Sequence, residues 1–142
     1  VDMYRQDWNS ALNDSARYDV YKMFKQGLYL EDYMDCVKIL KFRDSLIRVR
    51  LGISNLRVHK NRYAKADQQP DNSCPFCPNA VDDEVHMLYG CSEYQQLRPN
   101  FLRNVPVYNQ NLSFANIMST SDAGKLRQLA WYLFKCLQRH DQ

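Results

Sequence analysis

Apolar residues between Cys36 and Leu51 recur at the spacing of an α-helix. At 100° per residue they fall on one broad arc, while Lys38 and Lys41 lie opposite. The stretch contains no glycine or proline, and Gly52 stands where a helix-terminating glycine belongs. We therefore predict a helix over Cys36–Leu51 whose apolar arc consists of Cys36, Ile39, Leu40, Phe42, Leu46, Ile47, Val49 and Leu51.

Weaker helical patterns precede this segment, and a strong one ends the chain. Residues 2–13 predict a short amphipathic helix, and a second runs from a cap at residue 14 or 15 to Gly27. Ser121 and Asp122 start the last helix, whose apolar stripe is Leu126, Leu129, Ala130, Leu133 and Leu137. Trp131 points away from that stripe, where it either stacks on a partner or contacts the N-terminal helices.

Two short elements are expected between these helices. The capping box Ser92-Glu93-Tyr94-Gln95 predicts a helix through Leu97 that Pro99 bends or restarts. Residues 104–111 predict a loop, after which Ser113 caps a single turn over 114–118. The pattern predicts a mostly α single domain spanning 1–142, with a basic helical part (1–70), a metal loop and following helix (71–103) and a C-terminal helical part (104–142).

Positive charge is concentrated in residues 38–65, which we call the basic segment. It contains nine Lys or Arg and a single acid, Asp44, a net charge of +8 in a chain of +3, so the remainder carries −5. Such a concentration is typical of a phosphate-binding face, although a solvated helix face with a basic loop has the same composition. His59 and Asn61 add hydrogen-bonding groups. The candidate nucleic-acid contacts are Lys38, Lys41, Arg43, Arg48, Arg50, Arg57, Lys60, Arg62, Tyr63 and Lys65.

Arg43 and Arg50 fall inside the apolar arc of the predicted helix. A guanidinium buried there needs a partner, because an unpaired buried charge is very costly. One interpretation is that carboxylates or helix-end carbonyls hold both side chains in structural roles. The other is that the arc has a groove at these positions and the two arginines bind phosphate.

Three thiols and one imidazole follow the basic segment at the spacing C-x2-C-x8-H-x4-C. Zn²⁺ prefers four N or S ligands in a tetrahedron, and a structural site takes all four from protein. The alternatives are a redox-active thiol pair, which usually heads a helix in a βαβ unit, and a core histidine. The spacing predicts a zinc knuckle with at most a short β-hairpin and with the ligands Cys74, Cys77, His86 and Cys91. The remaining cysteines, Cys36 and Cys136, are expected to be buried thiols on helices.

The acids Asp82, Asp83 and Glu84 lie inside this loop and make it a poor phosphate ligand. We expect one of them to accept a hydrogen bond from the free ring N–H of His86, as is usual around metal-bound histidines. The loop would then hold the basic segment in place, and the basic segment would contact the nucleic acid. The triplet from Arg139 to Asp141 is expected to be a frayed chain end.

No catalytic motif emerges from the sequence. There is no Gly-rich phosphate loop, no G-x-S-x-G and no H-E-x-x-H, and a zinc site with four protein ligands has no position for a reacting water. The chain has no stretch apolar enough for a membrane span and no signal-peptide pattern, so we expect an intracellular protein of nucleus or cytoplasm, with no membrane partner. Because it begins on Val1 in mid-pattern, we expect a segment of something longer.

The metal loop resembles the zinc-binding region that follows the reverse transcriptase domain in non-LTR (LINE-like) retrotransposon polyproteins. The resemblance rests on Cys74 to Cys77, Asp83 to Cys91, Tyr94, Leu97 and Arg98, with weaker matches at Phe42, Arg43, Arg50 to Gly52, Arg62, Tyr63, Leu129, Ala130 and Leu133. It implies a non-catalytic region that binds template RNA or target DNA beside the remainder of a reverse transcriptase polyprotein. The chain lacks polymerase and nuclease domains, so retrotransposition itself is not expected of it.

Two main function classes therefore remain, beside a third in which the chain is an enzyme with an unrecognised site, which a water molecule in the metal coordination shell would support. The first is nucleic-acid binding, to RNA or DNA, through a basic helix and loop organised by structural zinc. The alternative is a zinc-stabilised protein–protein interaction module, a domesticated remnant in which the aromatic helices form the surface and the positive charge is incidental.

Overall fold

The computed structural model describes residues 36–65 and 67–141, and this part of the chain is mostly helical. Its α-helices are α3 (Leu40–Leu51), α4 (Arg57–Lys60), α5 (Gln110–Met118) and α6 (Ala123–His140). One π-helical turn (His86–Gly90) and four 3₁₀ turns (Asn61–Tyr63, Ser92–Tyr94, Asn100–Leu102 and Val107–Asn109) connect them. The predicted fold class is confirmed, whereas the helices predicted over 2–13 and 14–27 lie outside the described residues.

Helix α3 ends as predicted but begins later. Gly52 adopts a left-handed conformation (φ 69°) and donates its backbone N–H to Val49, while Ile53 donates to Arg48, as in a Schellman motif. The predicted start at Cys36 is wrong, because the helix begins at Leu40 after an extended Ile39. The preceding extended chain places Val37 in the core.

The apolar arc of α3 is narrower than predicted. Leu46 and Val49 are fully buried, but Ile39 and Leu40 are exposed because they lie at or before the first turn of the helix. Leu40 keeps 68% of its surface exposed. The buried part of the helix is therefore its C-terminal half.

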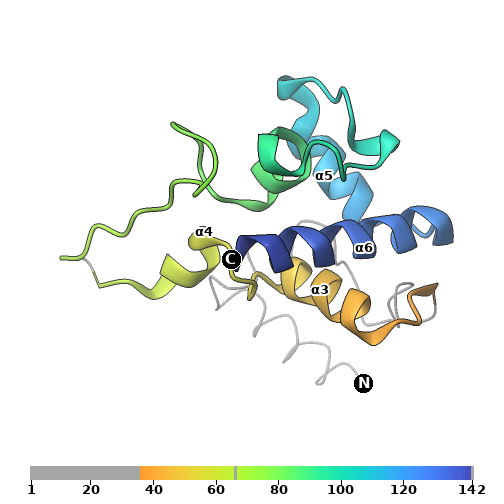
Figure 1. Cartoon of the computed structure of the whole chain (residues 1–142), viewed down its shortest axis with the longest axis horizontal. Coiled ribbons are helices and arrows are strands. Elements are labelled where there is room, and N and C mark those ends of the chain that lie inside the picture. Colours follow the sequence, from red (N-terminus) through yellow and green to blue (C-terminus); the bar gives the residue numbers. More distant parts are fainter. Residues whose placement is uncertain (1–35, 66, 142) are drawn as a thin grey trace, which may run out of the picture.

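Helix α6 forms the centre of the fold, with α3 along one side and α5 on the other (Figure 1). The predicted start is confirmed, since the Asp122 side chain accepts the backbone N–H of Lys125. The predicted stripe is also confirmed, and all five of its residues are buried: Leu126, Leu129, Ala130, Leu133 and Leu137. The buried Tyr132, whose hydroxyl donates to the Met87 carbonyl at 2.6 Å, connects α6 to the π-helical turn.

Two predicted short elements differ from the structure. The helix expected from Ser92 through Leu97 is a 3₁₀ turn, because the Ser92 hydroxyl lies 3.4 Å from the Cys77 sulfur and does not cap a helix. Helix α5 begins at Gln110, within the predicted loop, and Ser113 is not its cap. The Ser113 hydroxyl instead accepts a hydrogen bond from the Tyr89 hydroxyl at 2.8 Å.

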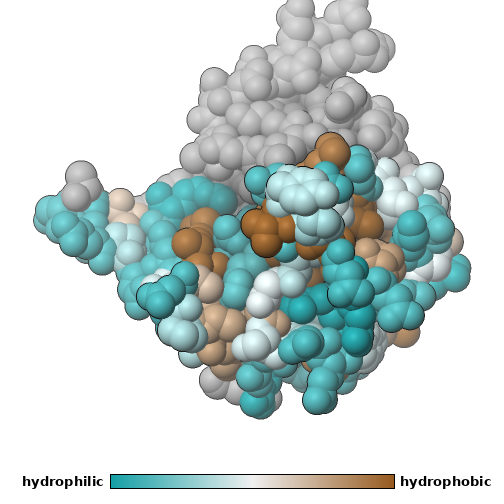
Figure 2. All heavy atoms as spheres, turned by 90° about the horizontal axis from the view of Figure 1, so that it is seen from above, coloured by the Kyte–Doolittle hydropathy of each residue, from teal (hydrophilic) through white to brown (hydrophobic). Residues whose placement is uncertain are grey.

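On the side seen in Figure 2, brown residues alternate with hydrophilic ones. Among the described residues, the most exposed large hydrophobic side chains are those of Val107 and Tyr108, at 84% and 89%. Among residues 36–65 and 67–141, no helix combines the length and the apolar character that crossing a membrane requires.

Candidate metal centre

The first two candidate ligands lie on a tight loop closed by backbone hydrogen bonds. The Cys74 N–H donates to the Ala80 carbonyl at 2.8 Å, and the Asp82 N–H donates to Asn72 at 2.7 Å. Ser73 and Val81 form an isolated antiparallel bridge, and no strand occurs in the part of the chain that the structure describes. The chain reverses between them, with Asn79 in the left-handed conformation (φ 61°). This reversal places Cys74 and Cys77 on the same side of the loop.

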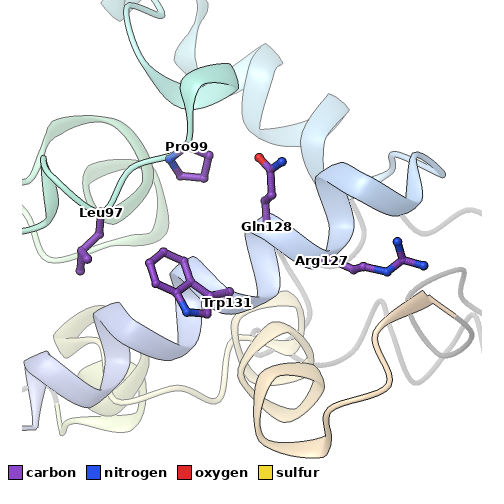
Figure 3. Close-up of a pocket in the computed structure, with 5 residues that line it drawn as sticks. All are labelled: Leu97, Pro99, Arg127, Gln128 and Trp131. Carbon is purple, nitrogen blue, oxygen red and sulfur yellow. The ribbon is translucent and has the colours of Figure 1, made fainter.

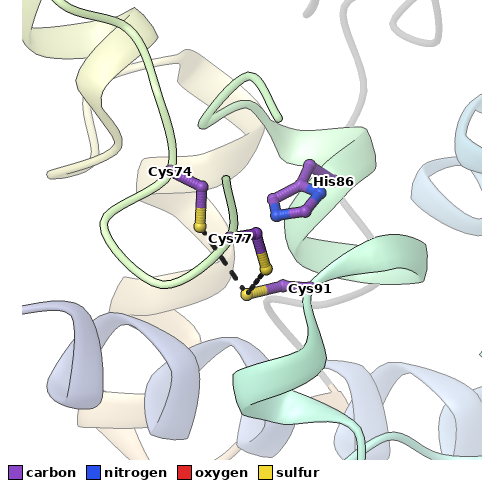
Figure 4. A group of neighbouring side chains, drawn as sticks. All are labelled: Cys74, Cys77, His86 and Cys91. Atoms are coloured by element: carbon purple, nitrogen blue, oxygen red, sulfur yellow. Dashed lines mark hydrogen bonds between the residues drawn. The ribbon is translucent and has the colours of Figure 1, made fainter. Parts of the chain in front are cut away.

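The other two candidate ligands are the first residue of the π-helical turn, His86, and the residue directly after it, Cys91. In an α-helix, residues five apart point about 140° away from each other. Here the Cys91 N–H donates to the His86 carbonyl at 2.8 Å, an i to i+5 bond that widens the turn. His86 and Cys91 therefore face the same side, toward the cysteine loop (Figure 4).

The four side chains converge on one point. The sulfurs of Cys74 and Cys77 each lie 3.8 Å from that of Cys91, and all four ligand atoms lie within 4.8 Å of one another. A disulfide would need sulfurs about 2.05 Å apart, and all five cysteines are free thiols. These four residues could therefore hold one metal ion.

The imidazole of His86 has a buried nitrogen that fits a metal. Its Nε2 is buried and has no hydrogen-bond partner within the described residues. Burial lowers the pKa of His86 and so favours the neutral ring, the form that coordinates metals. Gly90 lies close beside it, and a Cβ at that position would be 3.1 Å from His86 Nδ1, so that the ring would have to shift by a few tenths of an ångström.

The thiols occupy different environments. Cys91 is fully buried, which raises the pKa of its thiol, and Cys74 is also buried. Cys77 is partly exposed, and a hydrogen bond with the Ser92 hydroxyl lowers the pKa of its thiol. Metal coordination deprotonates thiols, so a bound dication would offset the effect of burial on the pKa of Cys91. Cys77 forms the solvent-accessible side of the site.

The three acids of the loop do not contact the His86 ring, which corrects the prediction that one of them would. Asp83 accepts the backbone N–H of His86 at 2.8 Å. Asp82 accepts the backbone N–H of Arg57 at 2.8 Å and pairs with His140 at 2.7 Å. Glu84 pairs with His59. Among the described residues, all three carboxylates are thus occupied in anchoring the loop.

Two histidines connect the loop to the helices. His59 is buried at 5% exposure between Glu84 and the Ser54 hydroxyl, so it is not a surface hydrogen-bonding group of the basic segment as expected. The side chain of His140 is only 6% exposed, so the expected frayed end is wrong at this residue. Burial opposes ionisation of Asp82, but the hydrogen bonds from His140 and Arg57 outweigh it and hold the pKa of Asp82 below its ordinary value.

The side chains of the basic segment fall into two groups, those exposed to solvent and those with ion-pair or hydrogen-bond partners within the protein. Lys38, Lys41, Lys60 and Lys65 are exposed, and none has a carboxylate partner in the described part of the chain. Other members of the segment have partners: Arg48 pairs with Asp44 at 2.8 Å, Arg57 with the carboxylate of Asp71 and the carbonyl of Ser73, and Arg62 with the carbonyl of Gly52.

Arg50 takes the structural role. It is 3% exposed and donates to the carbonyl of Met118, the last residue of α5. A helix-end carbonyl is the kind of partner expected for an arginine with a structural role. It therefore leaves the set of candidate phosphate contacts. Arg43 is half-buried on α3, and Tyr63 belongs to the 3₁₀ turn after α4.

Comparison with known proteins adds no relative: no family model, no curated protein and no solved structure matches the chain.

Proposed function

We propose that Cys74, Cys77, His86 and Cys91 hold a structural Zn²⁺ ion. Zinc–sulfur bonds of about 2.3 Å in a tetrahedron place two sulfurs about 3.8 Å apart. The two measured sulfur separations are 3.8 Å. Three soft thiolates and one imidazole suit zinc better than the oxygen-preferring cations. The partnerless Nε2 of His86 supports the fourth ligand.

The proposed role of the ion is structural rather than catalytic. Four protein ligands complete the tetrahedron and leave no coordination position for a reacting water. When bound, the ion would hold the loop Cys74–Cys77 against the turn His86–Cys91. Two of the three sulfurs are buried, which also limits the access of a substrate.

We further propose that the chain binds RNA or DNA through the basic segment, which the metal loop holds in place. The observation that carries this proposal is the contact between the two. The Asp82 carboxylate and carbonyl accept the backbone N–H groups of Arg57 and Val58, at 2.8 and 3.4 Å, so α4 is fastened to the metal loop. Lys60, at the end of α4, remains exposed. Because α4 is held in place, binding a phosphate there costs less conformational entropy than binding it to a mobile segment.

The proposed context is a retroelement-type reverse transcriptase protein of the nucleus or cytoplasm. Support comes from the C-x2-C-x8-H-x4-C spacing and its flanking residues. In that setting the rest of the polyprotein would supply the chemistry, and this region would contact the template or the target.

The test is the salt dependence of nucleic-acid binding by the zinc-loaded protein. Fluorescence anisotropy of labelled single-stranded RNA, single-stranded DNA and duplex DNA should show affinities that fall steeply with salt. Each phosphate contact contributes a slope of about 0.7 to 0.9 log units. Replacing Lys38, Lys41, Lys60 and Lys65 together with Gln should therefore lower the slope by about 3.

Lys125→Gln is the matched control, since this lysine lies on α6 over the Phe101 ring at 5.9 Å and outside the basic segment. It should leave the slope nearly unchanged. Absence of binding to all three nucleic acids at low salt, with zinc bound, would reject the nucleic-acid role.

A protein-interaction role is the second candidate, and one observation favours it. Val107, Tyr108 and Leu112 are 84%, 89% and 61% exposed within one short stretch leading into α5. Three large apolar side chains so close together are typical of contact surfaces. Zinc-loaded protein that binds no nucleic acid but loses a protein partner on Tyr108→Ala would support this alternative.

A further inference from the structure

Trp131 lies on the outer face of the central helix, beside a cavity. Its side chain is 36% exposed, although α6 buries seven other residues. The cavity of about 360 Å³ is lined by Leu97, Pro99, Arg127, Gln128 and Trp131 (Figure 3). Its volume lies in the range of small-molecule sites, which is about 300 to 1,000 Å³. The indole therefore borders a space that could accept a flat ring.

The surroundings of this cavity are cationic. Helix α6 contains four Lys or Arg and no acid between Ala123 and His140. Arg127 and Lys135 lie one turn before and one turn after Trp131, and Lys135 Nζ is 6.0 Å from the indole centroid. Neither cation pairs with a carboxylate among the described residues. An apolar cavity flanked by two cations that have no carboxylate partner in residues 36–65 and 67–141 is suited to a ligand that is both planar and anionic.

The cavity borders the start of the basic segment. Arg127 Nε donates to the Cys36 carbonyl at 3.1 Å, two residues before Lys38. Lys41 Nζ lies 5.2 Å above the ring of Phe134, which is also on α6. The start of the basic segment and the Arg127 and Lys135 side chains of α6 thus lie on neighbouring surfaces. A flexible phosphate chain could contact both.

We propose that Trp131 is a base-stacking site for single-stranded nucleic acid, with Arg127 and Lys135 contacting the flanking phosphates. This inference rests on the proposed nucleic-acid function and specifies its ligand as unpaired. Aromatic side chains beside cationic grooves bind unpaired bases by stacking, whereas bases inside a duplex have no free face. The pocket accepts a base on the indole, and Gln128 supplies an amide at its rim for the base edge.

The test uses the fluorescence of Trp131 in the zinc-loaded full chain. Trp8 is the other tryptophan of the sequence, so Trp8→Phe leaves Trp131 as the single indole reporter. Titration with a uridine decamer should quench this fluorescence with the same midpoint as anisotropy of the labelled decamer. A fully paired duplex of equal charge should bind without quenching.

Substitution supplies the second measurement. Trp131→Ala should weaken decamer binding about 5- to 150-fold, while Trp131→Phe keeps a stacking ring and loses less. Tyr108→Ala, which removes an exposed aromatic ring elsewhere, should leave affinity unchanged. Thermal melting of each variant ensures that only folded proteins are compared.

The outcomes separate the two proposals. If the decamer binds by anisotropy, yet Trp131 fluorescence does not change and Trp131→Ala retains full affinity, the stacking site is wrong and the nucleic-acid function stands. The same result would leave the cavity to a ligand of another class, such as a peptide. If no nucleic acid binds at all, the proposed function itself fails.

Discussion

The helix pair α3–α6 and the metal loop (residues 72–91) are held together by different kinds of contact. Between the helices the contacts are apolar: Leu46 and Val49 of α3 and Leu129 and Leu133 of α6 are all fully buried. Burying each such side chain contributes roughly 1.5 to 3 kcal/mol. Hydrophobic burial therefore accounts for the packing of this region.

The metal loop instead buries polar groups. Asp82 and Glu84 are 3% and 6% exposed, and Cys91 is fully buried. Burial of charge is costly unless each group is paired, and here His140 and His59 supply the partners. The comparison teaches that hydrophobic burial holds the helices together, whereas the loop is held by specific polar pairs around a cluster that could hold a metal ion.

Metal removal should produce the largest difference between the two regions, because it should unfold the loop and leave the helices folded. Structural zinc contributes about 10 to 16 kcal/mol of apparent binding energy in small sites. A strong chelator should abolish hydrogen-exchange protection of the Cys74 and Cys91 amides, which donate within the loop. Amides in the middle of α6 should stay protected. Exchange measured by NMR in the two states tests this.

Cys91→Ser is the genetic counterpart and should reduce bound zinc from one equivalent to none in metal analysis. Cys36→Ser is the matched control, because Cys36 is a free thiol outside the cluster, and it should retain one equivalent. Loss of α6 protection together with the loop would show that the two regions are not independent.

The reverse experiment removes core packing and leaves the metal site intact. Leu133→Ala on α6 should lower the free energy of unfolding by about 2 to 5 kcal/mol, because it creates a cavity at a fully buried site. The zinc content should remain one equivalent. Leu112→Ala, at a residue that is 61% exposed, should change stability by less than about 0.5 kcal/mol in the same urea titration.

The pair between Asp82 and His140 joins the two regions, and its removal should have an intermediate effect. His140→Ala should cost about 1 to 3 kcal/mol, since it leaves a buried carboxylate with one partner fewer. A double-mutant cycle with Asp82→Asn measures the coupling. Gln138→Ala, on the exposed face of the same helix end, should be neutral. A coupling near zero would mean that α6 and the loop are joined by other contacts.

The sequence predicted the features that depend on local spacing. Gly52 ends α3, Asp122 caps α6, and the leucine stripe of α6 is buried, because each follows from residues within a few positions. The four candidate ligands were also found, since metal ligands recur at characteristic spacings along the chain. These features needed no knowledge of distant contacts.

Features that depend on long-range pairing were missed. The partner of Asp82 is 58 residues away, and the sequence held no signal for it except that a buried carboxylate needs a cation or donor. The Ser92 hydroxyl was expected to cap a helix, but the neighbouring thiol competes for it. Arg127 and Lys135 of α6 flank Trp131 in the sequence, but they were not among the candidate contacts because they are spaced along a helix rather than clustered.

A smaller effect on zinc affinity is expected from a substitution at Gly90, which changes the geometry of the metal site without removing a ligand. In Gly90→Ala the new methyl group would lie 3.1 Å from His86 Nδ1, so the imidazole must tilt by a few tenths of an ångström. Zinc affinity should fall about tenfold, within the range that altered ligand orientation produces. Competition with a colorimetric chelator measures it, and Gly124→Ala on α6, where the nearest atom is 3.4 Å away, should bind zinc normally.

The smallest effect is expected at Ser92, whose hydroxyl lowers the pKa of the Cys77 thiol. In Ser92→Ala this pKa rises, so at a pH below it the thiolate needed for coordination is scarcer. One neutral hydrogen bond contributes about 0.5 to 1.5 kcal/mol, or about a two- to twelvefold weakening of zinc affinity near pH 6. The deficit should shrink as the pH rises, because above both pKa values the thiol is already deprotonated in either protein. Chelator competition at pH 6 and pH 9 tests the sign. A deficit that stays constant with pH would mean that Ser92 acts on the shape of the loop and not on the thiolate.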